Sequence, residues 1–229
     1  CHYVGHPVLE RGTAEAASSG FRRRFQLPSD APLIGLLPGS RRGELRHLMP
    51  VLSEAAARLR QTEPRPCFVI ATLPSLIAEL RAATASWPQA PLLVAAEQDR
   101  SDAYAACDVA LAASGTVTLE LAAAGTPMVI VYRGGLISAA IIRRLALVRF
   151  AGLPNLLLDR LLVPELLQEA CEPDALVKQA STLLRDPQAR AAQKAGFREV
   201  MARLAIEGNP SDRAAALLAD LLAMPVAGL

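Results

Sequence analysis

The sequence predicts an α/β domain, with a Rossmann-like parallel sheet that carries helices on both faces and is followed by C-terminal helices. Short apolar runs alternate with segments of helical periodicity between residues 33 and 147, as in chains that wind a parallel sheet. The apolar runs are nearly continuous, which is typical of strands covered on both faces. With 229 residues, 52% of them hydrophobic, the chain can bury a large core.

The expected elements follow one another in a regular order. Apolar runs predict strands at residues 33–37, 67–72, 91–95, 108–112 and 128–132, and a short sixth strand at 156–158. Helical spacing predicts helices at 43–60, 75–85, 101–106, 117–124 and 137–147, and an almost entirely helical tail from Pro164 onward. In such sheets ligands bind beyond the carboxyl ends of the strands. Binding residues are therefore sought just after Leu37, Ala112, Val131 and Leu158.

The beginning of the chain suggests a junction. It starts at Cys1 without an initiator Met, so we expect part of a longer protein. Residues 13–20 are small and polar and resemble an exposed connector. We expect residues 1–20 to be a linker from a missing N-terminal domain, and residues 21–229 to form the main domain with its helical tail.

The composition argues against several classes of function. A formal net charge of +2 does not favour a nucleic-acid partner. Four widely spaced cysteines and three histidines predict neither a zinc site nor a disulfide framework, which fits a reducing cytoplasm. No apolar stretch approaches the roughly 20 residues of a membrane span, so we expect a soluble or peripheral protein.

The first candidate site is Pro38-Gly39-Ser40-Arg41, where a predicted strand ends just before a helix. Such a turn exposes backbone N–H groups, and the helix N-terminus adds roughly half a positive charge. Arg41 can hold two phosphate oxygens with its guanidinium, whereas Arg42 is expected to face solvent. A simple turn would explain the small residues alone, and the loop matches neither the P-loop nor the dinucleotide-binding pattern.

The second candidate is Ser114-Gly115-Thr116, which follows the fourth predicted strand. Ser114 is placed to cap the next helix, a sufficient structural role by itself, while Gly115 allows close approach of a ligand. Glu120 lies four residues after Thr116 and so on the same side of that helix. Ser114 is not expected to be a nucleophile, because it lacks the G-x-S-x-G context and no histidine follows residue 47.

The third candidate lies at Pro164-Glu165-Leu166-Leu167-Gln168. On a helix, Glu165 and Gln168 would share a face, and a carboxylate there could accept two hydrogen bonds from a ribose 2′,3′-diol. The alternative is a solvated helix face. Asn155, in Leu153-Pro154-Asn155, belongs either to a simple turn or to the same cleft.

Taken in order, these stretches resemble the lipid-A-disaccharide synthase family, inverting glycosyltransferases of the GT-B type. The resemblance covers about residues 3–215 and rests on six short motifs. They are Tyr3-Val4-Gly5-His6-Pro7, Leu37-Pro38-Gly39-Ser40-Arg41, Ser114-Gly115-Thr116 with Thr118-Leu119-Glu120, Thr126-Pro127-Met128-Val129, Leu153-Pro154-Asn155 and Val163-Pro164-Glu165-Leu166-Leu167-Gln168. One departure is the glycine-rich Arg133-Gly134-Gly135-Leu136, where the family has a bulkier stretch.

The resemblance implies a reaction. Members transfer a sugar from UDP-2,3-diacylglucosamine to 2,3-diacylglucosamine 1-phosphate (lipid X), releasing UDP and forming the β-1′,6 disaccharide of lipid A, part of the lipopolysaccharide of Gram-negative bacteria. The chain resembles the second of two Rossmann-like domains, which holds the UDP-sugar, so the general base is expected in the absent first domain. No metal or other cofactor is expected.

The resemblance and the turns together give the expected donor-binding residues. They are Gly39, Ser40, Arg41, Ser114, Gly115, Thr116, Glu120, Asn155, Glu165 and Gln168. Arg41 and the turn at 114–116 would face the diphosphate, with Arg41 stabilising the leaving group, and Glu165 would face the ribose.

Three hypotheses remain open at this point. The chain is the donor-binding half of such a synthase, another GT-B enzyme of UDP-sugars (similar to UDP-N-acetylglucosamine 2-epimerase or a peptidoglycan-type transferase), or a nucleotide-binding fragment that is inactive alone. The motifs at 153–155 and 164–168 favour the first, with which the third is compatible.

The expected location is the cytoplasm, with peripheral contact at the cytoplasmic face of the inner membrane. The predicted helix at 137–147, with Arg143, Arg144 and Arg149 at its edge, is either a core helix with solvated arginines or a surface for acyl chains and anionic lipid.

Overall fold

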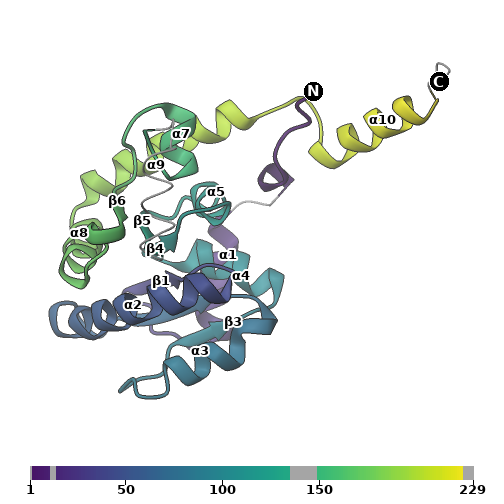
Figure 1. The fold of residues 1–229 in the computed structure, drawn as a ribbon. Helices are drawn as coiled ribbons and strands as arrows, with labels where there is room; N and C mark the ends of the chain where they lie inside the picture. The colour runs from purple at the N-terminus through teal and green to yellow at the C-terminus, as the bar shows by residue number, and fades with distance from the viewer. Residues whose placement is uncertain (1, 11–13, 135–148, 224–229) are drawn as a thin grey trace.

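The computed structural model describes residues 2–10, 14–134 and 149–223 and confirms the predicted α/β class. Its centre is a parallel sheet of six strands in the order β3-β2-β1-β4-β5-β6. The strands are β1 (Leu33–Leu37), β2 (Cys67–Ala71), β3 (Leu92–Val94), β4 (Val109–Ala113), β5 (Met128–Tyr132) and β6 (Glu165–Leu167). Helices cover both faces of this sheet (Figure 1).

The apolar strands supply two hydrophobic clusters, one on each face of the sheet. In β1, Ile34 and Leu36 enter one cluster, while Leu33 and Leu37 enter the other. The other central strands divide their side chains in the same way, because successive side chains of a strand point to opposite faces. Every residue of β1, β2 and β4 is therefore buried, which explains the continuous apolar runs in the sequence.

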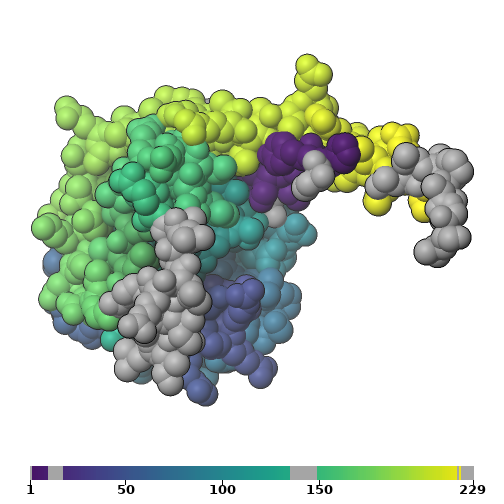
Figure 2. All heavy atoms as spheres, turned by 45° about the horizontal axis from the view of Figure 1, so that its top comes forward, coloured from purple at the N-terminus to yellow at the C-terminus, as the bar shows by residue number. Residues whose placement is uncertain are grey.

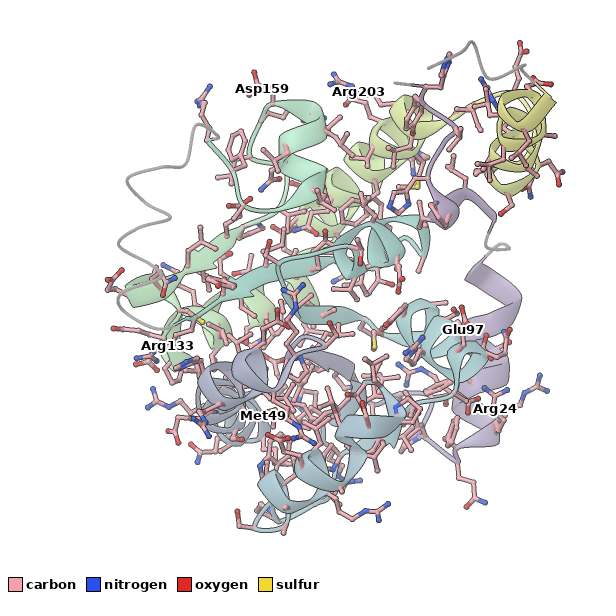
Figure 3. The ribbon with its side chains drawn as sticks, turned by 45° about the vertical axis from the view of Figure 1, so that its right-hand side comes forward. Arg24, Met49, Glu97, Arg133, Asp159 and Arg203 are labelled. Carbon is pink, nitrogen blue, oxygen red and sulfur yellow. The ribbon has the colours of Figure 1, made fainter. Side chains whose placement is uncertain are left out.

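The two clusters are closed by different helices. On one face α2 (Arg42–Thr62) packs against α8 (Pro173–Arg185), and on the other α1 (Ala14–Arg24) packs against α4 (Glu97–Ala106). Figure 3 shows Arg24 of α1 and Glu97 of α4 on the same side of the molecule. The remaining elements are η1 (Pro7–Glu10), η2 (Pro74–Leu76), α3 (Ile77–Ala83), α5 (Val117–Ala123), α7 (Leu153–Leu158), η3 (Gln168–Ala170), α9 (Pro187–Leu204) and α10 (Pro210–Ala223).

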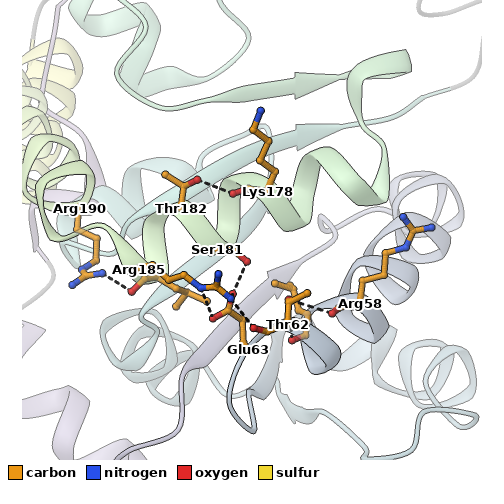
Figure 4. A network of polar contacts seen from close by, with 10 residues as sticks. Arg58, Thr62, Glu63, Lys178, Ser181, Thr182, Arg185 and Arg190 are labelled. Atoms are coloured by element: carbon orange, nitrogen blue, oxygen red, sulfur yellow. Dashed lines mark hydrogen bonds and ion pairs between the residues drawn. The ribbon is translucent and has the colours of Figure 1, made fainter.

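A polar network fixes the end of α2 to α8 (Figure 4). Glu63, whose side chain is only 3% exposed, accepts a hydrogen bond from Ser181 Oγ at 2.5 Å and pairs with Arg185 Nη2 at 2.9 Å. Arg185 also donates to the Thr62 carbonyl at 2.6 Å. A buried carboxylate needs such partners, so the network determines where these helices meet.

Three sequence-based expectations are wrong. Residues 156–158 belong to helix α7, and the sixth strand is β6, only three residues long. The segment from Pro164 onward therefore begins with a strand and the 3-10 turn η3 before the expected helices α8, α9 and α10. Most of the supposed connector at 13–20 is helical, because α1 begins at Ala14. The predicted helix at 137–147 lies outside the described residues.

The N-terminal segment lies against the end of α9 and the start of α10. Tyr3 donates its hydroxyl to the Leu204 carbonyl at 3.1 Å, and Gly5, with a φ of +96°, lies so close to the side chains of Ile206 and Pro210 that a Cβ would force one of them to shift. From this junction α10 extends away from the sheet (Figures 1 and 2). The proposed division into residues 1–20 and 21–229 stays a prediction. In the described ranges, no helix combines the length and apolarity of a membrane span.

Candidate functional site

A cavity of about 420 Å³ lies beyond the carboxyl ends of β1, β2 and β4. The chain first adds strands on one side of β1, as far as β3. It then crosses to the other side of β1 and adds β4, β5 and β6, so the strand order reverses between β1 and β4. Ligands bind at such a switch point in open α/β sheets. The cavity brings together seven residues predicted from the sequence, which are Gly39, Ser40, Arg41, Ser114, Gly115, Thr116 and Glu120.

The turn after β1 has a different internal structure from the one expected. Gly39 has a φ of +99°, and a Cβ at this position would overlap the carboxylate of Glu44. Glu44 Oε2 accepts hydrogen bonds from the backbone nitrogens of Ser40 at 2.9 Å and Arg41 at 3.2 Å. The N–H groups predicted to hold a phosphate are thus capped by a carboxylate of α2 itself, so the turn is a helix cap in this structure.

The Arg41 side chain nevertheless remains accessible at the cavity. It is 84% exposed, and its guanidinium lies 3.5 Å from Glu44 Oε1. Arg42, which does not line the cavity, is similarly exposed and lies 3.7 Å from Glu79 of α3. The two arginine side chains are therefore similarly exposed, but only that of Arg41 lines the cavity.

The turn after β4 is held by side chains of two neighbouring elements. Ser114 does not cap α5 as expected. Its Oγ donates to the Ala151 carbonyl at 2.7 Å, and the N-cap position belongs to Thr116. The buried Thr118 closes the turn by donating its hydroxyl to the Gly115 carbonyl at 2.7 Å. This leaves the small residues 114–116 facing the cavity, with Glu120 one helical turn further on.

A third wall was not predicted from the sequence. It consists of Thr72 and Leu73 at the end of β2, together with Arg100 and Tyr104 of α4. Thr72 was expected to be the last residue of the strand at 67–72, but β2 ends at Ala71. The rule that ligands bind beyond strand ends could have found it, because it lies at the carboxyl end of that strand. No comparable signal identifies Arg100, because its position depends on how α4 packs on the sheet.

Asn155 lies outside the cavity lining and is fully buried. Its Oδ1 accepts hydrogen bonds from the backbone nitrogens of Leu162 and Val163 at 2.8 and 2.9 Å, and its Nδ2 donates to the Val163 carbonyl at 2.8 Å. These bonds fix the loop that leads from α7 to β6. The side chain thus has a structural role in the described chain rather than a place in the cleft.

Glu165 and Gln168 also lie outside the cavity lining, and they do not share a helix face, because Glu165 is in β6 and Gln168 begins η3. The Glu165 carboxylate accepts hydrogen bonds from Ala151 N at 2.8 Å, Gly152 N at 2.9 Å and Asn155 Nδ2 at 2.7 Å. Gln168 accepts one from the Gly134 N–H at 3.2 Å. Glu165 therefore holds the N-terminal end of α7 against β6.

The two arginines of the described cavity lining differ in their ion pairs. Its ionisable lining residues include Arg41, Arg100, Glu44 and Glu120. Arg41 pairs with Glu44, whereas no carboxylate among the described residues forms a salt bridge with Arg100. Within the same ranges, no cluster of three His, Cys, Asp or Glu residues could hold a metal ion. The cavity can thus offer guanidinium groups to an anionic or acceptor-rich ligand.

Comparisons with solved structures agree with the fold. The crystal structure of Anabaena Alr3699/HepE in complex with UDP-glucose has a TM-score of 0.59 at 15% identity, covering 94% of this chain and 56% of that one. WaaG, a glycosyltransferase involved in lipopolysaccharide biosynthesis, has a TM-score of 0.56 at 16% identity, covering 91% and 51%. At these identities the likeness concerns the fold alone, which is the Rossmann-like architecture found in GT-B glycosyltransferases.

Sequence comparisons identify the family. The lipid-A-disaccharide synthases of Gluconobacter oxydans (strain 621H) and Rhodospirillum centenum (strain ATCC 51521 / SW) are each 42% identical to this chain. The alignments cover 98% and 97% of the chain but 54% and 56% of those proteins, so it spans about half the length of the curated relatives it matches. A family model described as lipid-A-disaccharide synthetase matches residues 1–219. On this evidence, the chain belongs to the lipid-A-disaccharide synthetase family.

Proposed function

We propose that this chain is the C-terminal, donor-binding half of a lipid-A-disaccharide synthase. In this proposal its cavity holds the UDP part of UDP-2,3-diacylglucosamine. The observation that carries the proposal is the cavity at the switch point, where the turns after β1 and β4 bring Arg41 and the small residues 114–116 into one lining. Family membership gives the nucleotide sugar as the candidate ligand.

The diphosphate would lie between Arg41 and the turn at Ser114-Gly115-Thr116. An exposed guanidinium can move to two phosphate oxygens, and small residues let the phosphates approach the backbone. In this arrangement Arg41 would stabilise the negative charge that develops on the leaving UDP.

The ribose would be bound by Glu120 rather than by Glu165, which the sequence had suggested. Glu120 lines the cavity, on the helix that follows the phosphate turn. The Glu165 carboxylate does not line the cavity, and it lies against the backbone at the start of α7 instead. Glu120 is therefore the better placed carboxylate for the 2′,3′-diol.

The transfer itself would need a second domain. The 6-hydroxyl oxygen of lipid X would attack the anomeric carbon of the donor from the face opposite the leaving group. The bond from that carbon to the diphosphate oxygen would break, and a general base would take the hydroxyl proton. No histidine is among the described residues lining this cavity, and we propose that the base comes from the part of the relatives that this chain does not match. Because both substrates are acylated, we also propose contact with the cytoplasmic face of the inner membrane.

Calorimetry tests the binding half of the proposal. The chain should bind UDP, and ADP should bind at least tenfold more weakly. If millimolar UDP gives no heat of binding, or if ADP binds with equal affinity, the proposed UDP site is contradicted.

A transfer assay tests the catalytic half. With radiolabelled donor and lipid X, the chain alone should form no disaccharide on thin-layer plates. Adding the matching N-terminal half of a related synthase, fused or in trans, should give product. Because a general base typically contributes about 10²–10⁴-fold, turnover by the chain alone would place the base within these 229 residues.

A further inference from the structure

The wall formed by Thr72, Leu73 and Arg100 has features that the binding of phosphates and ribose leaves unexplained. It lies at the β2 side of the cavity, whereas the phosphate turn follows β4, and β1 lies between these two strands. Neighbouring strands are about 4.8 Å apart, so the two ends of the cavity are separated by roughly 10 Å. That is about the distance from the phosphates to the base of an extended nucleotide.

Arg100 is the first unexplained group. It is partly buried on α4, and its guanidinium makes one long hydrogen bond, from Nη1 to the Thr72 carbonyl at 3.4 Å. Arg24 of α1, by contrast, pairs with both Asp99 and Asp102 of the same helix α4. Arg100 thus faces the cavity with most of its five N–H donors available.

Thr72 is the second unexplained group. The residue is 4% exposed, and its Oγ1 is buried without a hydrogen-bond partner in the described structure. A buried hydroxyl without a partner destabilises a fold, so it calls for an explanation. Because Thr72 lines the cavity and also contacts Arg100, both groups lie at the same corner.

We propose that Arg100 and Thr72 recognise the base of the bound nucleotide and select uracil. This inference rests on the proposed binding of UDP. The edge of uracil carries two carbonyl oxygens on either side of an N–H group. Arg100 can donate to a carbonyl, and the Thr72 hydroxyl, whose oxygen is enclosed in this structure, would turn about χ1 to accept from the N–H. Leu73, which is 36% exposed, offers an apolar surface to the ring. Cytosine carries an amino group in place of one carbonyl and would set a donor against Arg100.

Calorimetry with UDP, CDP and inorganic pyrophosphate tests this assignment on the complete chain. The unmodified chain should bind UDP at least tenfold more tightly than CDP. Arg100→Ala should weaken UDP binding about tenfold and bring UDP and CDP within about threefold of each other, without changing the affinity for pyrophosphate. Arg198→Ala, which removes the same charge from an exposed site on α9 outside the cavity lining, should change none of these values.

Thr72→Val gives an independent test, because valine keeps the shape and removes only the unpartnered hydroxyl. This variant should be at least as stable to urea as the parent chain and should bind UDP about five- to tenfold more weakly. A merely structural threonine would not show that combination.

The outcomes separate this inference from the proposed function. If the unmodified chain binds UDP but both variants keep its affinity and its preference over CDP, the base assignment is overturned and the proposed function stands. If Arg100→Ala weakens UDP, CDP and pyrophosphate equally, Arg100 binds phosphate and the base assignment is again overturned. If the unmodified chain does not bind UDP, both fail.

Discussion

Replacing Arg41 is the sharpest test of how the cavity holds a diphosphate, because the chain provides its own control in the next residue. The side chains of Arg41 and Arg42 are 84% and 81% exposed, so loss of charge and of packing should be nearly equal in the two alanine variants. Only Arg41 lines the cavity, whereas Arg42 lies near Glu79 of α3. A difference in UDP binding between the two variants would therefore show that the position of Arg41 at the cavity matters, and not merely the loss of a surface charge.

The expected effect of Arg41→Ala can be estimated from its surroundings. A charge-assisted hydrogen bond contributes about 1.5–3 kcal/mol, and the exposure of the guanidinium argues for the lower end. Glu44, whose carboxylate lies 3.5 Å from the guanidinium, repels the phosphates equally in the parent chain and in the variant, so it adds nothing to the difference. A loss of about 1.5 kcal/mol corresponds to roughly tenfold weaker binding.

The assay is calorimetry with UDP and uridine at two salt concentrations. Arg41→Ala should lose UDP affinity and much of its salt dependence, whereas uridine binding should barely change because uridine has no phosphates. Arg42→Ala should bind UDP within about twofold of the parent chain. If Arg42→Ala is the more damaging variant, or if uridine and UDP are weakened alike, the placement of the phosphates beside Arg41 is wrong.

Three further predictions concern the frame of the site. Gly39→Ala should lower the free energy of unfolding in urea by about 1–2 kcal/mol, because its Cβ displaces the Glu44 cap. Gly115→Ala shares the strain of a positive φ (+154°) but meets no atom within 4 Å, so it should cost less, and the reverse order would refute the cap. Asn155→Ala should lower the free energy of unfolding by about 2–4 kcal/mol, because buried backbone groups lose their partners, and UDP affinity should stay within about threefold. A loss of affinity without a loss of stability would show a ligand contact instead. Burial raises the pKa of the Cys107 thiol, so little thiolate forms, and iodoacetamide at pH 8 should leave Cys107 unmodified until urea unfolds the chain. Rapid alkylation in the folded state, seen by peptide mass spectrometry, would contradict its core position.

The expected strands at 33–37, 67–72, 91–95, 108–112 and 128–132 match β1 to β5, and most of these strands are under strong physical constraint. β1, β2 and β4 are buried on both faces, so nearly every residue in them must be apolar. β6 has three partly exposed residues at the edge of the sheet, and its polar Glu165 gave no such signal. The three leucines at 156–158 are apolar enough to resemble a strand, but they belong to α7, and Pro154 in its first turn suits a helix start.

The missed helix α1 depends on tertiary contacts. Its first residues are small and show no apolar stripe, and of residues 18–24, whose burial is described, Phe21 alone is buried. It is fixed by pairs that the sequence does not reveal, because Arg22 bonds to Asp108 at 2.8 Å and Arg24 to α4. Sequence periodicity cannot register partners that lie 75–86 residues away.

The candidate site was predictable only where position along the chain determines position in space. The turns after β1 and β4 must lie at the same edge because parallel strands end together, and both line the cavity. The wall of Thr72 and Arg100 joins two segments whose proximity depends on the packing of α4. The structural role of Glu165 could not be predicted either, because it accepts hydrogen bonds from backbone N–H groups at the start of α7, a helix that the sequence did not predict.

A short chain of hydrogen bonds gives a physical reason why residues outside the cavity are still needed to shape it. Ser114 Oγ, at the phosphate turn, donates to the Ala151 carbonyl, and the Ala151 N–H donates to Glu165. Glu165 in turn accepts from Asn155, which fixes the loop leading back into β6. The turn after β4 is therefore held from the side by α7 and β6, two elements that contribute nothing to the lining of the cavity. Glu165 and Asn155 act on the site through the backbone of residue 151, so substitutions there should disturb the fold before they disturb the ligand.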